Sequence, residues 1–385
     1  MSQSNRHAQK ALALHKKLRG KISLLPKMAV KTKADLALVY TPGVGAVSTY
    51  LAAHRDQVRD YTMQGNTVAV VSDGSAVLGL GNIGPEGALP VMEGKCLLFK
   101  TLANVDAFPL VLNTQDVDEI VATVKNIAPV FGGINLEDIA APKCFEVEAK
   151  LRKLIDIPVF HDDQHGTALV VLAGLINACR VARHDLKTSK VVINGAGAAG
   201  QAIAKLLLLF GVQDIVLVDS RGILGPKRRD LDPFKKELLK ATNPRKLDGD
   251  LEQALREAEI CIGVSKAGAI TRKHIGVMAQ RPIVFALANP IPEIMPEEAK
   301  RAGVYVIATG RSDFPNQINN SLGFPGIFRG ALDHRVKEIT EPMLVEAAKN
   351  LARLVARPTR ENIIPNNFDP RVVKAVAKAI REHSL

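Results

Sequence analysis

Two aspartates and two histidines crowd into one short stretch, VFHDDQHGTALV, at residues 159–170. Asp162 and Asp163 are adjacent, and carboxylates that are buried side by side repel unless a cation, a proton or solvent separates them. Capping the helix expected after them would need only one aspartate. His161 and His165 have the H-x₃-H spacing of some zinc sites, but they flank a turn and do not share one helix face. The stretch therefore favours a site built from carboxylate oxygens over a zinc site.

A second pair of adjacent acids, Glu137 and Asp138, follows an apolar approach in GGINLEDIAAPKC. Each pair alone would be read as solvated surface acids. Two such pairs, offering only oxygen ligands, suit a hard cation such as Mg²⁺ or Mn²⁺, which leaves coordination positions open for substrate oxygens.

A glycine-rich loop directly follows an expected strand and opens an expected helix in KVVINGAGAAGQ. Its G-x-G-x-x-G spacing permits a tight turn, a close approach of a pyrophosphate to the backbone, and close packing of the helix on the strand. Asp219 ends the next strand, where a carboxylate hydrogen-bonds a ribose 2′-hydroxyl. We predict that this loop binds a nicotinamide dinucleotide. The residues of the loop are Gly195, Ala196, Gly197, Ala198, Ala199 and Gly200.

The choice between the two nicotinamide cofactors depends on the surroundings of Asp219. Its carboxylate would repel a 2′-phosphate, which favours NAD. Arg221 and the basic run 227–229 could accept that phosphate instead, so NADP stays open.

A second glycine-rich loop, GLGNIG at residues 79–84, has the same spacing after a strand. Pro85 and EGALP follow it, and this sequence does not suggest an amphipathic helix. We therefore expect no helix N-terminus to face a phosphate there, and we place the loop on the substrate side.

The elements that must position these residues divide into two halves near residue 165. The first half is expected to contain strands at 67–74, 96–100 and 108–113. The second alternates strands and helices, which is typical of a doubly wound parallel sheet. We predict an α/β protein with an N-terminal α/β catalytic domain (1–165) and a Rossmann-like NAD(P)-binding domain (166–385) that includes the C-terminal helices. A helix at 167–183 would bridge the halves.

Composition limits the partners. The net charge of +12 could attract nucleic acid, but the basic residues are spread along the chain, aromatic residues make up only 4%, and tryptophan is absent. An anionic cofactor and an acidic small substrate fit the same charge. We expect no apolar stretch long enough to span a membrane. The basic first 34 residues are read as a surface helix rather than a targeting peptide. The four cysteines form no C-x-x-C pair, which favours free thiols and a cytoplasmic protein.

Several motifs, in this order along nearly the whole chain, resemble those of the malic enzymes of the short bacterial kind. They are YTPGVG (40–45), VSDGSAVLGLGNIGPEGALPVMEGKCLLFK (71–100), INLEDI (134–139), VFHDDQHGTA (159–168), ANP (288–290) and GRSDFPNQINN (310–320). The resemblance implies oxidative decarboxylation of malate to pyruvate, with NAD or NADP and a divalent metal, Mg²⁺ or Mn²⁺. It also implies a homodimer or higher homo-oligomer.

The resemblance also assigns roles to individual residues. Tyr40 resembles the family's general acid and Lys95 its general base, with Asp162 assisting the base. Metal ligands would be Glu137, Asp138 and Asp163. Asn289 would contact both cofactor and substrate, and Asn320 the substrate. Larger relatives place an arginine near Ala76 to hold a substrate carboxylate, so this contact is open here and Arg311 is a candidate.

The chemistry makes one demand on Lys95. A lysine with the usual pKa of about 10.4 is protonated at neutral pH, so we expect burial and a nearby cation to depress the pKa of Lys95. The alternatives are a malolactic enzyme, which would release lactate from malate using NAD and Mn²⁺, and a dinucleotide-binding regulator or nucleic-acid binder with a degenerate site.

Overall fold

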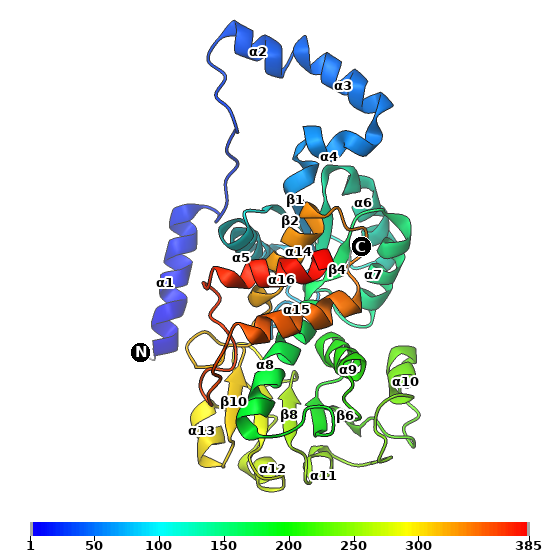
Figure 1. Ribbon diagram of the computed structural model, residues 1–385, viewed down its shortest axis with the longest axis vertical. Coiled ribbons are helices and arrows are strands. Elements are labelled where there is room, and N and C mark those ends of the chain that lie inside the picture. The colour runs from blue at the N-terminus through cyan, green and yellow to red at the C-terminus, as the bar shows by residue number, and fades with distance from the viewer. Residues whose placement is uncertain (1–2, 383–385) are drawn as a thin grey trace.

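Two sheets lie one above the other in the computed structural model, which describes residues 3–382 (Figure 1). The strands are β1 (Thr67–Ser72), β2 (Asp106–Val111), β3 (Gly133–Leu136), β4 (Val159–His161), β5 (Lys190–Asn194), β6 (Asp214–Asp219), β7 (Gly222–Ile223), β8 (Ile260–Gly263), β9 (Ile283–Ala286) and β10 (Val306–Thr309). The helices are α1 (Gln3–Leu18), α2 (Lys33–Val39), α3 (Gly43–Ala53), α4 (Val58–Tyr61), α5 (Gly84–Ala103), α6 (Val117–Ile127), α7 (Lys143–Leu154), α8 (Thr167–Ala182), α9 (Ala198–Phe210), α10 (Pro233–Leu239), α11 (Leu251–Leu255), α12 (Arg272–Gly276), α13 (Pro296–Arg301), α14 (Phe324–Asp333), α15 (Glu341–Arg353) and α16 (Arg371–Glu382).

The first sheet has the strand order β2-β1-β3-β4, and its paired strands are parallel. Every residue of β1 is buried, as expected for a parallel strand that is covered on both faces. Helices α6 and α7 pack on one face through an apolar cluster. Helices α5 and α14 pack on the other face.

The second sheet has the order β10-β9-β8-β5-β6-β7, parallel except for the short β7. Helices α8 and α9 lie on one face, and α11, α12 and α13 lie on the other. This is the doubly wound arrangement predicted from the alternating strands and helices, so the predicted fold class is confirmed.

The last three helices connect the two sheets. Helix α14 contacts α5 and β3 of the first sheet, whereas α15 packs on α8 and α9 of the second (Figure 1). Phe99 of α5 meets Phe324 and Phe328 of α14 with ring centroids 4.7 and 5.4 Å apart. Such aromatic pairs contribute about 0.5–1.5 kcal/mol each beyond the area they bury, and they fix α5 on the body.

The segment 96–100, predicted as a strand, is helical, and this prediction was wrong. It is the last part of α5, which begins immediately after the GLGNIG loop with Pro85 in its first turn. The expectation that no helix follows that loop was also wrong. Proline is favoured in a first helical turn, where its missing N–H has no partner to lose. The buried side chains recur at helical spacing: Ala88, Met92, Lys95, Cys96, Phe99 and Ala103.

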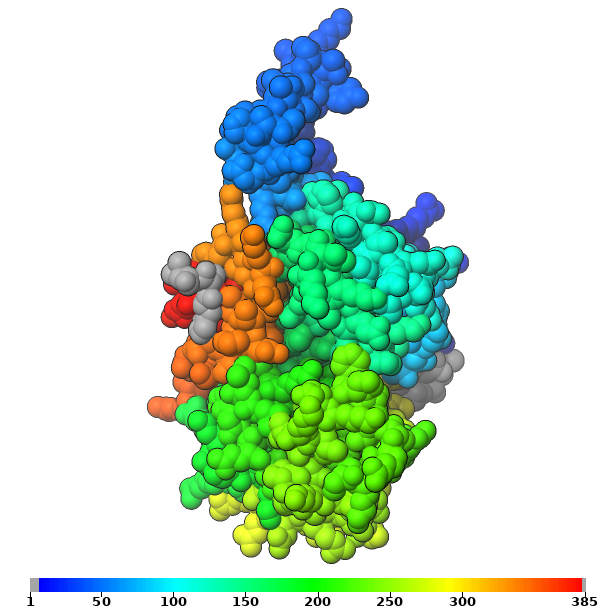
Figure 2. All heavy atoms as spheres, turned by 90° about the vertical axis from the view of Figure 1, so that its right-hand side faces the viewer, coloured from blue at the N-terminus to red at the C-terminus, as the bar shows by residue number. Residues whose placement is uncertain are grey.

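The N-terminal arm, defined as residues 3–63 with helices α1 to α4, lies apart from the body. Helices α2 and α3 project away from both sheets (Figures 1 and 2). None of the side chains described between residues 7 and 63 is buried.

Two helical segments are long and apolar enough to cross a membrane by length and composition, contrary to the expectation from the sequence. One is Asp162–Ala182, which is mostly buried and serves as a core helix between the halves. The other is Lys33–Ala53 of the arm, which buries nothing.

Candidate active site

The candidate active site is a cleft of about 440 Å³ between the two sheets. Glu137 directly follows β3 of the first sheet, and Ser265 and Asn289 follow β8 and β9 of the second. Ligands of open α/β sheets bind outside the carboxyl ends of the strands. The cleft is lined by Ala76, Leu78, Gly79, Val91, Gly94, Lys95, Leu98, Glu137, Asp138, Asp163, Thr167, Val170, Ala199, Val264, Ser265, Leu287, Ala288, Asn289, Ile318, Asn319, Asn320 and Phe324.

Glu137, Asp138 and Asp163 form one carboxylate cluster at the floor of the cleft. Each offers an oxygen, and these oxygens all lie within 4.8 Å of one another. The backbone N–H of Asp138 donates to Oδ2 of Asp163 at 2.8 Å, which ties the two acidic segments together. Asp138 has a φ of +53°, a left-handed conformation that aspartate tolerates better than most residues.

The cluster is electrostatically unfavourable by itself. Burial raises the pKa of Glu137 to about 7, of Asp138 to about 9 and of Asp163 to about 6, and repulsion from Asp163 contributes to the first two. Oδ2 of Asp138 is buried without a hydrogen-bond partner. A buried acceptor without a donor needs an explanation, and a set of buried carboxylate oxygens suits a hard divalent cation. The donor atoms therefore fit Mg²⁺ or Mn²⁺.

Lys95 reaches this cluster from α5. Its ammonium group pairs with Asp162 and lies 2.5 Å from Oε2 of Glu137, above the ring of Phe324 at 4.5 Å. Burial alone would lower the pKa of Lys95, but the charges of Asp162, Glu137 and Asp163 outweigh it and the pKa is raised. The structure thus contradicts the expectation of a depressed pKa for Lys95, because the acidic groups around the amine favour its charged form.

The turn that carries Asp162 and Asp163 is η4 (Asp162–Gly166), one turn of π-helix at the start of α8. Single turns of π-helix are rare in proteins, and those that occur are often found at functional sites. A side chain at Gly166 would place Cβ 1.7 Å from Oδ1 of Asp162, so any larger residue would force Asp162 away from its contact with Lys95.

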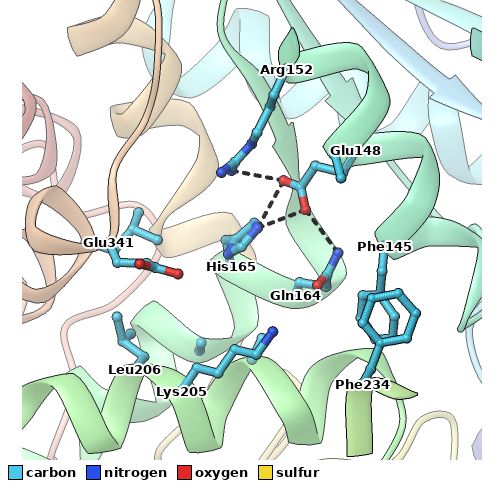
Figure 3. A pocket seen from close by; sticks show the side chains of 13 residues that line it. Phe145, Glu148, Arg152, Gln164, His165, Lys205, Leu206, Phe234 and Glu341 are labelled. Carbon is cyan, nitrogen blue, oxygen red and sulfur yellow. Dashed lines mark hydrogen bonds and ion pairs between the residues drawn. The ribbon is translucent and has the colours of Figure 1, made fainter. Parts of the chain in front are cut away.

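Glu148 of α7 holds this turn from behind, which the sequence reasoning missed. Its carboxylate accepts from the backbone N–H of His161 and from the side-chain amide of Gln164, and it lies 2.9 Å from Nε2 of His165 and from Arg152. Figure 3 shows the contacts of Glu148 with Arg152, Gln164 and His165, all four of which line a second cavity of about 260 Å³. The sequence did contain a sign of this role: Glu148 lies on the buried face of a helix together with Val147 and Leu151.

Glu148→Gln is expected to destabilise the protein. Removing one member of a buried ion pair costs about 3 kcal/mol or more, because the remaining charge loses its partner. Unfolding in urea at neutral pH measures the change. Glu146→Gln is the matched control, because Glu146 lies two residues away on the same helix and is exposed. Equal stability of the two variants would contradict the role given to Glu148.

The same substitution should change the pH dependence of stability. Burial raises the pKa of Glu148, but His165 and Arg152 outweigh it and lower the pKa from 4.5 to about 2. The stabilisation that ionised Glu148 gives to the folded protein is therefore present above about pH 4.5, and it is lost as the pH falls toward 2. Between roughly pH 5 and pH 2 we expect the melting temperature of the wild type to fall more steeply than that of Glu148→Gln.

The predicted dinucleotide loop lines a separate crevice of about 410 Å³ beside the cleft. Gly195 has a φ of +127°, and a Cβ at Gly200 would lie 1.8 Å from the carbonyl oxygen of Gly195. Gly197 has open space where its Cβ would point. The loop therefore combines a tight turn and close helix packing with an exposed backbone, as pyrophosphate binding requires. Ala199, also in this loop, lines the adjacent cleft and so connects the crevice with the candidate active site.

Asp219 lies at the end of this crevice with two cations on its carboxylate. Arg228 and Lys235 approach it at 3.0 and 3.1 Å. Burial raises the pKa of Asp219, but three hydrogen bonds have the larger, opposite effect, so the pKa lies below its usual value. The donors are the side chains of Arg228 and Lys235 and the backbone N–H of Arg221.

Most of the predicted site residues come together, and two do not. Lys95, both acidic segments, Asn289 and Asn320 meet at the cleft. Tyr40 lies between α2 and α3 of the projecting arm and is 66% exposed. Arg311 pairs with Asp313 and donates to the carbonyl of Pro290, outside the cleft lining.

Two largely parallel sheets and a glycine loop that opens a helix define a class, the dinucleotide-binding α/β proteins, and the acidic cluster between the sheets could hold a hard cation. Comparisons with known proteins identify the family. The model described as "Malic enzyme, N-terminal domain" matches residues 19–152, and "Malic enzyme, NAD binding domain" matches residues 164–383. The chain belongs to the malic enzyme family.

Individual relatives are similar to this chain over nearly its full length. The bifunctional malic/malolactic enzyme of Bacillus subtilis is 54% identical, covering 98% of this chain and 93% of the relative. The NAD-dependent malic enzyme of Geobacillus stearothermophilus is 53% identical, covering 94% and 76%. The crystal structure of the NAD-dependent malic enzyme from Thermotoga maritima superposes with a TM-score of 0.93 at 49% identity, covering 96% of this chain and 98% of that one. NADP-dependent malic enzymes are also among the relatives.

Proposed function

We propose that the protein catalyses oxidative decarboxylation of (S)-malate to pyruvate and CO₂, with reduction of NAD⁺ or NADP⁺ and with Mg²⁺ or Mn²⁺ bound. The observation that carries this proposal is the convergence of Lys95 and the three carboxylates in one cleft, next to Ala199 and Asn289 on the dinucleotide side. A single bound hydroxy acid could contact all of them.

Glu137, Asp138 and Asp163 would hold the divalent ion, and the loop 195–200 would hold the dinucleotide. When bound, the ion supplies a Lewis acid for the C2 oxygen and a substrate carboxylate, and the nicotinamide supplies the hydride acceptor.

The protein's own groups then move two protons. A cation held by the three carboxylates would offset the negative charges that raise the pKa of Lys95, and so would allow its neutral form. Neutral Lys95 accepts the proton of the C2 hydroxyl as the hydride leaves C2, which yields the 2-keto acid. Asp162 keeps the amine oriented by accepting its hydrogen bond. The C3–C4 bond breaks and CO₂ leaves. The electron pair of that bond forms a C2–C3 double bond, while the carbonyl pair moves onto the C2 oxygen. Protonation at C3, which we assign to the hydroxyl of Tyr40, gives pyruvate. Each positioned transfer contributes about 10²–10⁴-fold.

Asn289 and Asn320 are proposed to orient substrate, and Asn289 also the nicotinamide. Asn289 is packed closely: a Cβ at Gly79 would lie 1.8 Å from its carbonyl oxygen, and one at Gly310 would lie 2.7 Å from its side-chain nitrogen. This fixes the amide at the cleft wall. No described arginine lines the cleft, so we assign the remaining substrate carboxylate to amide donors.

The test is an assay of purified protein with malate, with each cofactor in turn, with and without Mn²⁺. Metal-dependent rise of absorbance at 340 nm and formation of pyruvate are expected. No turnover with either cofactor would refute the proposal.

A malolactic reaction is the second candidate, because the relative from Bacillus subtilis is named a bifunctional malic/malolactic enzyme. The same cleft would reduce the pyruvate before release. Lactate formed from malate without net accumulation of NADH would favour it.

We propose NAD as the preferred cofactor, on the basis of the carboxylate of Asp219. Asp219→Ala is expected to shift the preference toward NADP by about tenfold, which corresponds to about 1.4 kcal/mol. The substitution removes a charge that repels a 2′-phosphate, and it frees Arg228 and Lys235 to bind one. The measurement is the ratio of kcat/KM for the two cofactors.

Asp214→Ala is the matched control for that change. Asp214 begins the same strand at its other end and pairs with Arg245, away from the crevice. Its cofactor ratio should equal that of the wild type. An unchanged ratio in Asp219→Ala would remove Asp219 from cofactor selection.

We propose a homodimer or higher homo-oligomer that acts on malate, with no nucleic acid or membrane as partner, in the cytoplasm. The free thiols of all four cysteines, which are buried, are consistent with a reducing compartment. We also propose a domain boundary near residue 165, where η4 leads into α8.

A further inference from the structure

Glu293, in the segment that follows β9, is a fully buried carboxylate that the proposed reaction does not use. It is not among the described residues that line the cleft or the crevice. Burying a carboxylate is costly unless its oxygens are hydrogen-bonded. Burial raises the pKa of Glu293, and hydrogen bonds from the backbone of Ser265 and Ala288 act in the opposite direction. An acid kept in such a place, directly behind a candidate active site, needs a reason.

The partners of Glu293 come from two segments that follow the neighbouring parallel strands β8 and β9. Oε1 accepts the backbone N–H of Ser265 at 2.7 Å, and Oε2 accepts the backbone N–H of Ala288 at 3.0 Å. Ser265 and Ala288 both line the cleft, and Ser265 also lines the crevice. Glu293 therefore joins two parts of the cleft wall from behind.

The end of β8 leaves room for this carboxylate. A Cβ at Gly263 would lie 2.6 Å from Cδ of Glu293, and its three nearest atoms all belong to that side chain. The backbone of Gly263 is not in the left-handed region, so glycine is required here for space and not for conformation. Gly263 and Glu293 thus form one seat.

The two anchored peptide groups direct their carbonyls toward residues assigned to cofactor and substrate. In a trans peptide the N–H and the C=O point in opposite directions, so a bond from the N–H to Glu293 fixes the direction of the carbonyl. The carbonyl oxygen of Val264 would lie 2.4 Å from a Cβ at Gly195, against the dinucleotide loop. The carbonyl oxygen of Leu287 accepts from the side-chain amide of Asn289 at 3.4 Å.

We propose that Glu293 is a positioning residue for hydride transfer, because it holds segments 264–265 and 287–289 at the spacing that brings the nicotinamide to C2 of malate. The inference rests on the proposed function for the reaction, but not for the anchoring of the two segments. A displacement of about 1 Å, caused by a change far from the chemistry, can slow a reaction about 100-fold. A residue that touches neither reactant can therefore control the step.

Hydrogen exchange tests the anchoring without relying on catalysis. Glu293→Gln keeps the size of the side chain, but an amide has only one acceptor oxygen, so one of the two N–H groups loses its partner. Exchange in 264–266 or 287–289, followed by mass spectrometry, should become about tenfold faster or more, as expected when a hydrogen bond to a charged group is lost. Exchange in 133–138 of the first sheet should not change. Unchanged exchange in both segments would overturn the proposal even if malate turnover is found.

Turnover per binding site tests the step itself. Sites are counted by fluorescence titration with the reduced cofactor, so that a loss of folded protein does not enter the rate. With saturating malate, Mn²⁺ and the preferred cofactor, kcat per site should fall about 10- to 100-fold in Glu293→Gln. Malate deuterated at C2 should react more slowly still, because hydride transfer then limits the rate.

A merely structural role for Glu293 would lower the number of sites and leave the rate per site unchanged. That result would overturn the proposal, and so would a slow rate without an isotope effect. A wild type that does not oxidise malate would refute the proposed function, whereas the hydrogen-exchange result would still decide whether Glu293 anchors the two segments.

Gly263→Ala disturbs the same seat without removing the charge, because its methyl group would displace the carboxylate of Glu293. It should slow turnover per site like Glu293→Gln, and the double variant should be no slower than the slower single variant, since both changes act on one contact. Losses that multiply would overturn the proposal. Glu298→Gln is the matched control, because it removes an exposed carboxylate from the first turn of α13. Its rate per site and its exchange should equal those of the wild type, and losses as large as in Glu293→Gln would also overturn the proposal.

Discussion

Lys95→Ala should lower kcat by about 10²–10⁴-fold, the range for loss of a positioned proton acceptor. The amine is the only nitrogen base among the described ionisable side chains that line the cleft. It is already in contact with Asp162 and Glu137. Hydride transfer from C2 requires loss of the hydroxyl proton, so a cleft without this amine should bind substrate and cofactor but turn over slowly.

Cofactor binding separates this effect from a loss of folding. The dissociation constant for NADH, measured by fluorescence, should change little, because the loop 195–200 lies on the second sheet. Lys100→Ala is the matched control: it lies on the same helix, is exposed and pairs with Asp106. Near-normal turnover in Lys95→Ala, or an equal loss in Lys100→Ala, would contradict the assignment of Lys95.

The sequence could predict the second sheet and its nucleotide loop because both depend on short-range patterns. Strand, G-x-G-x-x-G and helix follow one another within 190–210, and the structure shows the expected steric reasons for Gly195 and Gly200. The predicted family and fold class are confirmed by the family models and by the structural relatives. Metal binding, by contrast, stays a prediction, supported by the convergence of two acidic segments.

Helix α5 was missed for a physical reason. The apolar run at 96–100 is short, and short apolar runs fit a buried strand and a buried helix equally well by periodicity alone. The decisive pattern spans 88–103, with buried positions three or four residues apart. Reading the run within that longer window would have predicted a helix. It would also have placed Lys95 on a rigid element.

Other features could not be read from the sequence because they depend on long-range contacts. The raised pKa of Lys95 follows from carboxylates that are distant along the chain. The place of Tyr40 depends on whether the arm packs on its own body, which apolar content does not decide. Arg311 was a candidate from its motif, but the nearby Asp313 already holds its guanidinium group.

Asp163→Asn should weaken Mn²⁺ binding by at least about 100-fold, because changes even to groups behind a metal ligand cost about 10–100-fold. The amide oxygen can still accept the N–H of Asp138, so the local backbone should persist. Three carboxylates within 4.8 Å of one another, two of them buried, repel one another. The substitution should therefore raise the melting temperature of the metal-free protein, while the further rise on adding Mn²⁺ disappears. Stability without metal and affinity for metal change in opposite directions.

Titration of Mn²⁺ by electron paramagnetic resonance measures the affinity directly, and calorimetry gives the two melting temperatures. Asp162→Asn is the matched control, because it is the adjacent acid and pairs with Lys95 but lies outside the three-carboxylate group. It should slow turnover while leaving Mn²⁺ affinity within a few-fold of the wild type. Parallel losses of Mn²⁺ affinity in both variants would mean that the turn as a whole, and not Asp163, holds the cation. An unchanged titration in Asp163→Asn would exclude Asp163 from the metal site and leave Glu137 and Asp138 without their third ligand.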